Sequence, residues 1–331
     1  MKRNQLVIQD LRVDYVTEDE TVHAVNGVSF ELAEGESLGI VGETGAGKTT
    51  TALAILGLLP RPTGRVSSGS ILFYDRDLVQ APEETMREIR GNEISMIFQD
   101  PMTSLNPIFT VGDQIAEVIE VHNQVSREES RKRAGDMLEL VGIPRGRMGE
   151  FPHQFSGGMK QRVVIAMALA CNPRLLLADE PTTALDVTIQ AQVLRMMRSL
   201  KEKFNTSLVM ISHDLGVVAQ ICDKAAIMYA GSILEFGGLR DVFARPLHPY
   251  TEGLFNSIPR LDLDRERLAP IGGLMPDPSR LPPGCVFHPR CPYAEEVCRR
   301  RTPASTVVGE RRVMCLMYEG VMENTMRRTH G

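Results

Sequence analysis

Two short glycine-bearing segments carry the residue types that bind phosphate. The first, GETGAGKT, spans residues 42–49, and the second, FSGGMKQR, spans residues 155–162. Glycines leave backbone amides open to an anion, and the N-terminus of a helix adds a favourable dipole. A Ser-Gly-Gly turn that opens a helix is therefore a second phosphate-binding element beside the glycine loop. Two such elements in one chain predict a nucleotide clamped between two bodies.

The glycine loop has the composition needed for a nucleotide and a metal ion. Lys48 supplies a cation to the β and γ phosphates, and the Thr49 hydroxyl is placed for Mg²⁺. A chance glycine turn is the alternative, but an apolar strand precedes the loop and a helix follows it, as a phosphate loop requires. The residues expected to contact the nucleotide here are Gly42, Thr44, Gly45, Ala46, Gly47, Lys48, Thr49 and Thr50.

Further polar side chains each follow an apolar run that is typical of a buried strand. Asp179 could hold the Mg²⁺ shell, and Glu180 beside it could accept a proton from attacking water. Gln99 could ligate Mg²⁺ or orient the water, and His213 could contact the γ phosphate. Ligands of open α/β sheets bind at the carboxyl ends of strands, so we expect these four side chains to meet. The structural alternatives are a helix-initiating acid for Glu180 and a solvated or capping side chain for His213.

The elements that must position these residues follow from hydrophobic periodicity. Residues 5–35 alternate apolar and polar side chains, which predicts a small antiparallel sheet with a hairpin turn at 17–20. Tyr15 lies in this part and could stack on adenine, or could be a plain aromatic residue of the sheet core. Buried strands are expected at 38–41, 94–98, 175–178, 207–211 and 225–229, and helices at 48–58, 111–122 and 127–141.

Composition limits the class of protein. The 331 residues suit one large domain with an appendage, and a hydrophobic content of 43% is typical of a globular core. A net charge of −5 argues against a dedicated nucleic-acid binder, so no nucleic-acid partner is expected. No apolar run approaches the roughly 18 residues of a membrane span, and no signal peptide is visible. Any membrane role is therefore expected to be peripheral.

In their order along the chain, these motifs resemble those of an ABC-type ATPase cassette. The glycine loop matches its Walker A motif, Gln99 its Q-loop, FSGGMKQR its signature, LLLADE its Walker B motif, TALD at 183–186 its D-loop, and His213 its switch histidine. The resemblance covers about residues 5–240. It implies an α/β fold, a P-loop NTPase ABC cassette whose RecA-like core carries an antiparallel β subdomain and an inserted α-helical subdomain at about 102–160.

The resemblance also implies how the second phosphate-binding turn is used. ABC cassettes form head-to-tail dimers, in which Ser156, Gly157 and Gly158 of one chain would close over ATP held by the Walker A motif of the other. Asp186 of the D-loop is likewise expected among the residues that contact the nucleotide. Glu180 would be the catalytic base, with Gln99 and His213 beside it. The partner cassette could be identical or a related second chain.

The C-terminal part resembles the tail of the peptide/nickel importer ATPases. The segments HPYT at 248–251 and PPGCVFHPRCP at 282–292 carry this likeness. It implies a cassette over residues 1–244 and an oligopeptide/dipeptide-importer-type extension over 245–331. The implied partners are two transmembrane permease subunits at the cytoplasmic face of the cell membrane and, indirectly, an extracytoplasmic substrate-binding protein. Import of nickel or oligosaccharides, or a soluble non-transport ABC ATPase, remain alternatives.

Four cysteines gather in this extension. Cys285, Cys291, Cys298 and Cys315 are separated by five, six and sixteen residues. Four thiolates could hold zinc or an iron–sulfur cluster, but zinc ribbons favour C-x₂-C knuckles and this spacing has none. The resemblance to peptide importers implies a 4Fe–4S cluster, with a structural role. Cys171 and Cys222 lie in apolar helical contexts, which predicts ordinary core residues.

Overall fold

A computed structural model describes residues 3–183, 185–257 and 271–322 of the chain. Its strands form one four-stranded sheet, ordered β2-β1-β4-β5, and one eight-stranded sheet, ordered β11-β12-β10-β9-β3-β8-β7-β6. The strands of the smaller sheet are β1 (Asn4–Val16), β2 (Thr21–Ala33), β4 (Gly64–Phe73) and β5 (Arg76–Asp77). Those of the larger sheet are β3 (Ser37–Val41), β6 (Ile94–Ile97), β7 (Leu175–Asp179), β8 (Ser207–Ser212), β9 (Lys224–Tyr229), β10 (Ser232–Gly238), β11 (Thr306–Val308) and β12 (Arg311–Val313).

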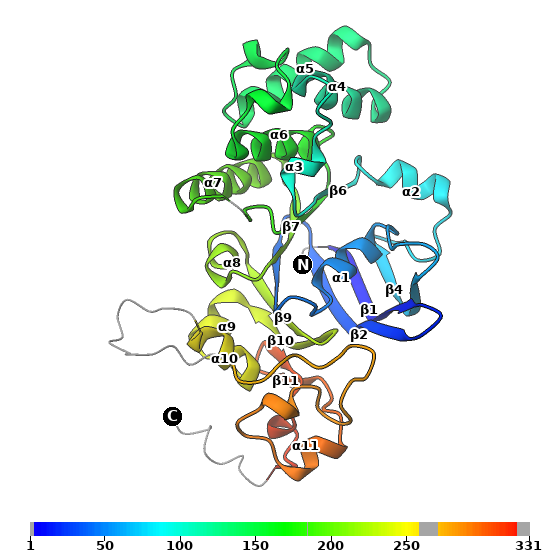
Figure 1. The fold of residues 1–331 in the computed structure, drawn as a ribbon, viewed down its shortest axis with the longest axis vertical. Coiled ribbons are helices and arrows are strands. Elements are labelled where there is room, and N and C mark those ends of the chain that lie inside the picture. The colour runs from blue at the N-terminus through cyan, green and yellow to red at the C-terminus, as the bar shows by residue number, and fades with distance from the viewer. Residues whose placement is uncertain (1–2, 184, 258–270, 323–331) are drawn as a thin grey trace.

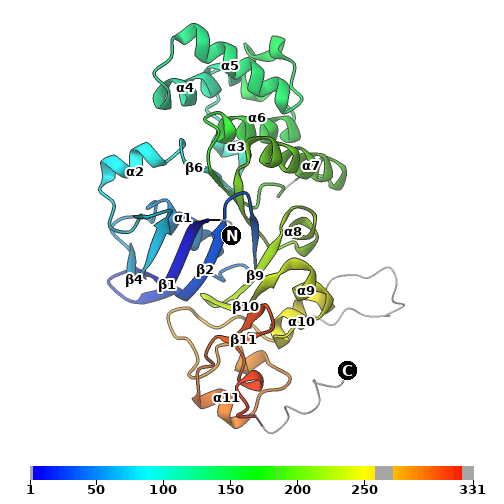
Figure 2. The same cartoon turned by 180° about the vertical axis from the view of Figure 1, so that it is seen from behind.

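The helices divide between the flanks of the larger sheet and a separate layer beyond its β6 edge (Figures 1 and 2). That layer contains α3 (Pro101–Ser104), α4 (Val111–His122), α5 (Arg127–Leu140) and α6 (Gly157–Leu169). The other helices are α1 (Lys48–Ile55), α2 (Glu83–Ile89), α7 (Val187–Phe204), α8 (Leu215–Ile221), α9 (Leu239–Ala244), α10 (Pro249–Asn256) and α11 (Glu296–Arg300).

The smaller sheet confirms the hairpin expected from alternation. β1 and β2 pair antiparallel, from Val16 opposite Thr21 to Asn4 opposite Ala33, so residues 17–20 form the turn. Apolar side chains on one face of this sheet share a buried core with α1 and the strands behind it. Burial of that face joins the smaller sheet to the nucleotide-binding side of the larger one.

The central strands of the larger sheet are parallel and buried. β3 pairs with β8 and β9, and β7 pairs with β6 and β8. Every residue of β3, β7 and β8 is buried, which explains their continuous apolar runs. Because these strands run in one direction, their carboxyl ends open on one edge, where the loops with the predicted site residues emerge.

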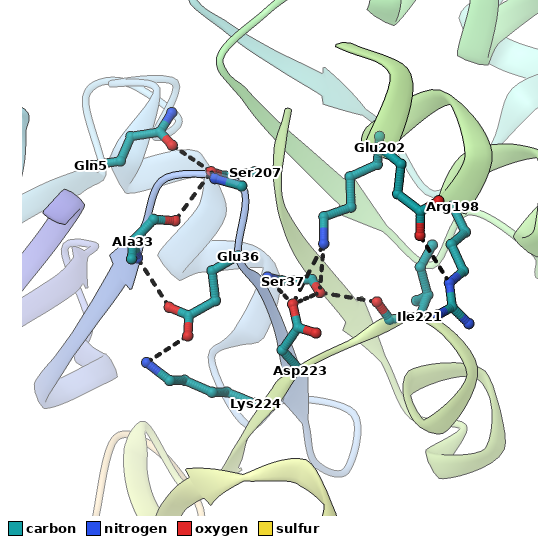
Figure 3. A network of polar contacts seen from close by, with 12 residues as sticks. Gln5, Ala33, Glu36, Ser37, Arg198, Glu202, Ser207, Ile221, Asp223 and Lys224 are labelled. Carbon is teal, nitrogen blue, oxygen red and sulfur yellow. Dashed lines mark hydrogen bonds and ion pairs between the residues drawn. The ribbon is translucent and has the colours of Figure 1, made fainter. Parts of the chain in front are cut away.

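A polar network fixes the opposite end of β3 (Figure 3). The Ser37 hydroxyl donates to Asp223 Oδ2 at 2.6 Å and to the Ile221 carbonyl at 3.0 Å, and Lys201 Nζ donates to Ser37 Oγ at 3.0 Å. Nearby, the Ser207 hydroxyl accepts the Gly35 amide at 2.8 Å. Because Ser37, Asp223 and Lys201 are hydrogen-bonded to one another, they hold the strand that leads into the glycine loop at little cost in desolvation.

The helical layer matches the prediction closely. α4 has the expected bounds, and Thr110 caps it by accepting the Asp113 amide. Ser126 caps α5 in the same way through the Glu129 amide, and α5 ends one residue before the predicted end. Side-chain caps of this kind satisfy helix N-termini that would otherwise lack acceptors. The layer is thus a folded subdomain inserted between β6 and β7.

The C-terminal segment contains strands that the sequence did not predict. β12 pairs antiparallel with β10, placing Glu235 opposite Val313 and Phe236 opposite Arg312, and β11 pairs with β12. Glu235 is fully buried, and its carboxylate accepts the Leu247 and His248 amides at 2.9 to 3.1 Å. The C-terminal segment therefore continues the larger sheet through β12. The buried Glu235 carboxylate also holds the backbone at residues 247–248, just before α10.

Candidate functional site

The glycine loop lies between β3 and α1, as a phosphate loop requires. Gly47 precedes α1 with φ +96°, a left-handed conformation that glycine adopts readily. A Cβ added at Gly47 would lie 2.3 Å from the Ala24 carbonyl oxygen, and one at Gly42 would lie 2.1 Å from the Met228 carbonyl oxygen. Larger residues at either position would push the loop away from the sheet, so both glycines serve close backbone packing.

The loop lysine is buried and folds onto the loop itself. Lys48 Nζ donates to the carbonyl oxygens of Gly42 at 2.8 Å and Glu43 at 2.9 Å. Burial lowers the pKa of the Lys48 ammonium, and the carboxylates of Glu180 and Asp179 partly oppose that shift. A desolvated ammonium with nearby carboxylates suits a site that receives phosphates together with a divalent cation.

Asp179 ends β7 beside the loop and is 3% exposed. Burial raises the pKa of its carboxyl, while a hydrogen bond from the Thr49 hydroxyl opposes this change. A hydroxyl and a carboxylate that already touch are hard oxygen donors of the kind Mg²⁺ prefers. The donor set of Thr49 and Asp179 therefore fits Mg²⁺, which would supply positive charge against the phosphates.

The Glu180 carboxylate contacts the two other predicted catalytic side chains, His213 and Gln99. Its Oε1 lies 2.8 Å from His213 Nδ1, and its Oε2 accepts from Gln99 Nε2 at 3.2 Å and from the Thr183 hydroxyl at 3.0 Å. Burial raises the pKa of the Glu180 carboxyl, but hydrogen bonds from His213 and Thr183 and the Lys48 charge outweigh it, so the pKa is lowered. Glu180 is therefore ionised at neutral pH, as a general base must be.

Tyr15 lies on β1 at the edge of this site. Its hydroxyl donates to the Thr50 hydroxyl at 3.3 Å. Two of the residues expected to contact the nucleotide are therefore hydrogen-bonded to each other. The ring is half-buried rather than part of the sheet core, which leaves part of it available for stacking. The role of Tyr15 in adenine stacking stays a prediction.

The signature turn begins α6 in the helical layer, apart from α1 in both views (Figures 1 and 2). Ser156 caps the helix by accepting the Met159 amide, and a Cβ at Gly157 would meet no described atom within 4 Å. Gly158 packs against Ile189, where a Cβ would lie 2.6 Å from that side chain. The turn is thus an exposed helix N-terminus within the described part of the chain.

The D-loop is only partly described. Ala184 lies outside the described residues, and Asp186 caps α7 by accepting the Ile189 amide at 2.9 Å. That carboxylate is exposed and caps a helix within the chain, and its contact with the nucleotide stays a prediction.

The four cysteines of the extension line one small cavity. Cys285, Cys298 and Cys315 are buried, and Cys291 is partly exposed. Burial raises the pKa of the Cys291 thiol to about 12, with smaller contributions from the other three cysteines. Within the described part of the chain, no three His, Cys, Asp or Glu side chains are arranged to hold a single metal ion.

Of the two remaining cysteines, Cys222 lies in the core as predicted, whereas Cys171 does not. Cys222 is buried in the main core, and burial raises the pKa of its thiol. Cys171 is half-buried and accepts a hydrogen bond from Asn123 Nδ2 at 3.5 Å.

Sequence reasoning missed one set of contacts at the phosphate loop. Arg290 of the extension forms an ion pair with Glu43, and the Tyr250 hydroxyl accepts the Glu43 amide at 3.1 Å. Both partners lie more than 200 positions away along the chain. Only the charge of Arg290 inside the tail motif hinted at an acidic partner, and nothing local identified which one.

A glycine loop with a buried lysine, a buried aspartate that accepts from Thr49, and an adjoining ionised glutamate lie at the carboxyl edge of a parallel sheet, which is the arrangement of a P-loop ATPase. Two family models match the chain: "ABC transporter" over residues 25–183, and "Oligopeptide/dipeptide transporter, C-terminal region" over residues 234–298. The chain belongs to the ABC transporter family, as an ATP-hydrolysing subunit of an ABC importer.

Named relatives agree over most of the chain. The dipeptide transport ATP-binding protein DppD of Bacillus subtilis is 53% identical over 304 residues, covering 91% of each chain. The oligopeptide transport ATP-binding protein OppD of Salmonella typhimurium is 52% identical over 300 residues, covering 90% of this chain and 89% of its own.

A solved structure supports the fold. The ATP-binding cassette MJ0796, a dimer in a post-hydrolysis state bound to ADP and Pi, superposes with a TM-score of 0.64 at 27% identity. It covers 71% of this chain and 99% of that one, so the likeness confirms the cassette. Among the helices described here, none has the length and apolar character to cross a membrane.

Proposed function

We propose that this chain supplies ATP-driven force for the import of dipeptides or oligopeptides. The observation that carries the proposal is that one chain joins an ABC cassette to an extension matched by the oligopeptide/dipeptide transporter model. Relatives named for dipeptide and for oligopeptide transport, each about half identical over some nine-tenths of the chain, support the same cargo. The chain would act at the cytoplasmic face of the membrane, with two permease subunits and, indirectly, an extracytoplasmic binding protein.

We also propose a role in ATP binding or hydrolysis for each residue of the candidate site. ATP would place its phosphates on the glycine loop and Lys48, with Mg²⁺ held by Thr49 and Asp179. Glu180 would take the proton of the attacking water, and His213 and Gln99 would orient the γ phosphate and that water. The contacts supporting these roles are the Thr49–Asp179 hydrogen bond and the bonds that Glu180 accepts from His213 and Gln99.

A second cassette would complete this site. The exposed Ser156 cap and the open position beside Gly157 support binding of the signature turn to ATP on another subunit. Backbone amides at a helix N-terminus would then contact the γ phosphate from the side opposite the glycine loop. ATP binding would close the pair and hydrolysis would release it, moving the permeases.

We also propose a 4Fe–4S cluster on Cys285, Cys291, Cys298 and Cys315, with a structural role. Support comes from the shared cavity and from the ligand type, since cysteine thiolates hold such clusters. A zinc ion needs all four sulfurs about 2.3 Å from one point, whereas a cluster spreads its ligands over several irons. The cluster is proposed over zinc on the cysteine spacing, which lacks the C-x₂-C knuckles that zinc ribbons favour.

The proposed domain division is a cassette through residue 244, with its helical subdomain at about 102–160, and an extension over 245–331. The pairing of β12 with β10 adds that the two parts share one sheet.

Uptake of a labelled dipeptide tests the proposed cargo. Cells lacking this chain should regain uptake with the wild-type chain but not with Lys48→Ala. The matched control, Lys132→Ala, removes an exposed lysine of α5 and should restore uptake fully. Restored uptake of nickel or an oligosaccharide without peptide uptake would refute the cargo. A chain found only in the soluble fraction, without permeases, would refute transport.

A further inference from the structure

The phosphate loop is held from outside the cassette at one residue, Glu43. Arg290 Nη1 lies 3.0 Å from Glu43 Oε1 and 3.1 Å from Oε2, so one nitrogen bridges both carboxylate oxygens. The Tyr250 hydroxyl accepts the amide of the same residue at 3.1 Å. Side chains from α10 and from the cysteine-bearing segment therefore converge on the second position of the loop.

All three nitrogens of the Arg290 guanidinium donate hydrogen bonds. Its Nε donates to the Gly272 carbonyl at 2.9 Å and its Nη2 to the Ile271 carbonyl at 3.3 Å, while the group lies 5.7 Å from the centre of the Tyr229 ring. The side chain is only 5% exposed, against 33% for Glu43. A planar guanidinium used in this way is rigid, and no other side chain offers its fork of donors.

Glu43 also contacts the lysine of the phosphate loop, Lys48, so the restraint extends to that side chain. The Glu43 carbonyl oxygen accepts from Lys48 Nζ at 2.9 Å and from the Ala46 amide at 3.2 Å. The carboxylate, amide and carbonyl of Glu43 are thus each fixed by a different partner. Ordering a loop before the ligand arrives lowers the entropy lost on binding, so the restraint should favour nucleotide affinity.

The segment that follows Ile271 also borders the loop. A Cβ at Gly45 would lie 3.1 Å from Met275 Cε, and the Pro278 carbonyl accepts the His23 amide at 3.0 Å. His23 is on β2, next to the residue paired with Tyr15. The extension therefore runs from the glycine loop toward the edge of the smaller sheet, along the nucleotide side of the cassette.

From these contacts we infer that Arg290 is a positioning residue for ATP binding, which holds the phosphate loop through Glu43 and makes the C-terminal extension part of the nucleotide site. The inference rests on the proposed nucleotide site. Arg290 also ends the 3₁₀ turn His288–Arg290, between Cys285 and Cys291, so the cysteine cavity and the loop share one structural support.

Arg290→Met removes the charge and all donors while keeping an apolar stem. In the full complex, it should raise the KM for MgATP at least about fivefold, a typical size for coupling between sites, and leave kcat nearly unchanged. Glu43→Gln, altered on the cassette side, should act in the same direction. Because both variants break one ion pair, the double variant should be no worse than the more affected single variant. Arg290→Lys should recover part of the affinity.

The matched control is Arg301→Met, which breaks the Arg301–Glu319 ion pair of 2.7 Å elsewhere in the extension. It should leave the KM unchanged, and thermal unfolding should show that each variant is folded. Wild-type MgATP affinity in both Arg290→Met and Glu43→Gln would overturn the inference, as would an equal loss in Arg301→Met. Lys48→Ala separates the two claims, since undiminished binding in that variant would instead refute the proposed nucleotide site.

Discussion

The backbone conformation of Glu180 decides which side chains its carboxylate can contact. Its backbone has φ +47°, in the left-handed region that few non-glycine residues occupy, and its amide donates to the Ile211 carbonyl at 2.9 Å. Such conformations cost energy and persist where surrounding contacts enforce them. Here the turn directs the carboxylate toward His213, Thr183 and Gln99 rather than along the strand.

These contacts should set the pH dependence of ATP turnover through the pKa of Glu180. The pKa of Glu180 is lowered, so the base stays ionised as pH falls and is lost only below the ordinary glutamate value of about 4.3. His213→Ala removes a hydrogen bond to the ionised form, which should raise that pKa. The acid limb of the kcat profile of the complex should therefore move to higher pH.

Thr183→Ala removes a hydroxyl donor to Glu180, and Thr183 has no proposed contact with phosphate. It should shift the acid limb in the same direction, which separates the effect on Glu180 from any loss of γ-phosphate binding. An acid limb that stays in place or moves to lower pH in both variants would contradict the assigned cause.

The positions of most candidate site residues could be predicted from the sequence, because these residues lie in short local motifs. Asp179 and Glu180 follow an apolar run, and that run becomes the buried strand β7, which fixes their place at the sheet edge. Gln99 was expected near Mg²⁺, yet its amide donates to Glu180 here, so its metal contact stays a prediction. Side-chain direction at a loop depends on long-range partners that a local pattern does not contain.

At the scale of elements, the link between cassette and extension depends on Glu235. It lies on β10, fully buried, and accepts amides of the chain that turns into α10, with Arg311 of β12 at 3.5 Å. One carboxylate thus joins the last cassette strand to two separate parts of the extension.

Glu235→Ala should destabilise the protein by about 3 kcal/mol, because it leaves two buried amides without their acceptor and removes the carboxylate beside the Arg311 guanidinium. The measurement is the free energy of unfolding from urea titration. Glu310→Ala, an exposed glutamate in the turn before β12, is the control and should change it by less than about 0.5 kcal/mol. Equal stability of the two variants would disprove the structural role of Glu235.

The sequence patterns did not predict β4, β10, α2 or α7, and they also missed two short C-terminal strands, for which the physical cause is clear. β11 (TVV) and β12 (RRV) are three residues long and carry no readable alternation. They are strands only because β10 offers an edge, and such pairing depends on tertiary contact more than on intrinsic propensity. The long buried strands and the capped helices α4 and α5 carry their signal locally, which is why their bounds were predicted well.

At the scale of the whole molecule, the proposed site is divided between subunits. Ser156→Arg would put a bulky cation at the signature turn, where a second subunit's ATP should bind. The isolated chain should still bind MgATP, whereas hydrolysis in the complex should fall by about 10² or more, as when preorganised donors are lost. Binding titration and steady-state turnover measure the two effects.

Ser126→Arg is the matched control, because Ser126 caps α5 through the Glu129 amide just as Ser156 caps α6 through Met159. It should cost about 1 kcal/mol of stability and leave turnover unchanged. If Ser126→Arg abolished turnover equally, or Ser156→Arg retained it, the signature turn would not be acting on nucleotide.

The most direct test of the central claim is ATP turnover by Glu180→Gln in the assembled complex, measured beside MgATP binding. The change removes the proposed base while keeping the size of the side chain, so binding should persist. General-base catalysis typically contributes at least about 10²-fold, and turnover should fall by that amount or more. Turnover at the wild-type rate would contradict the account.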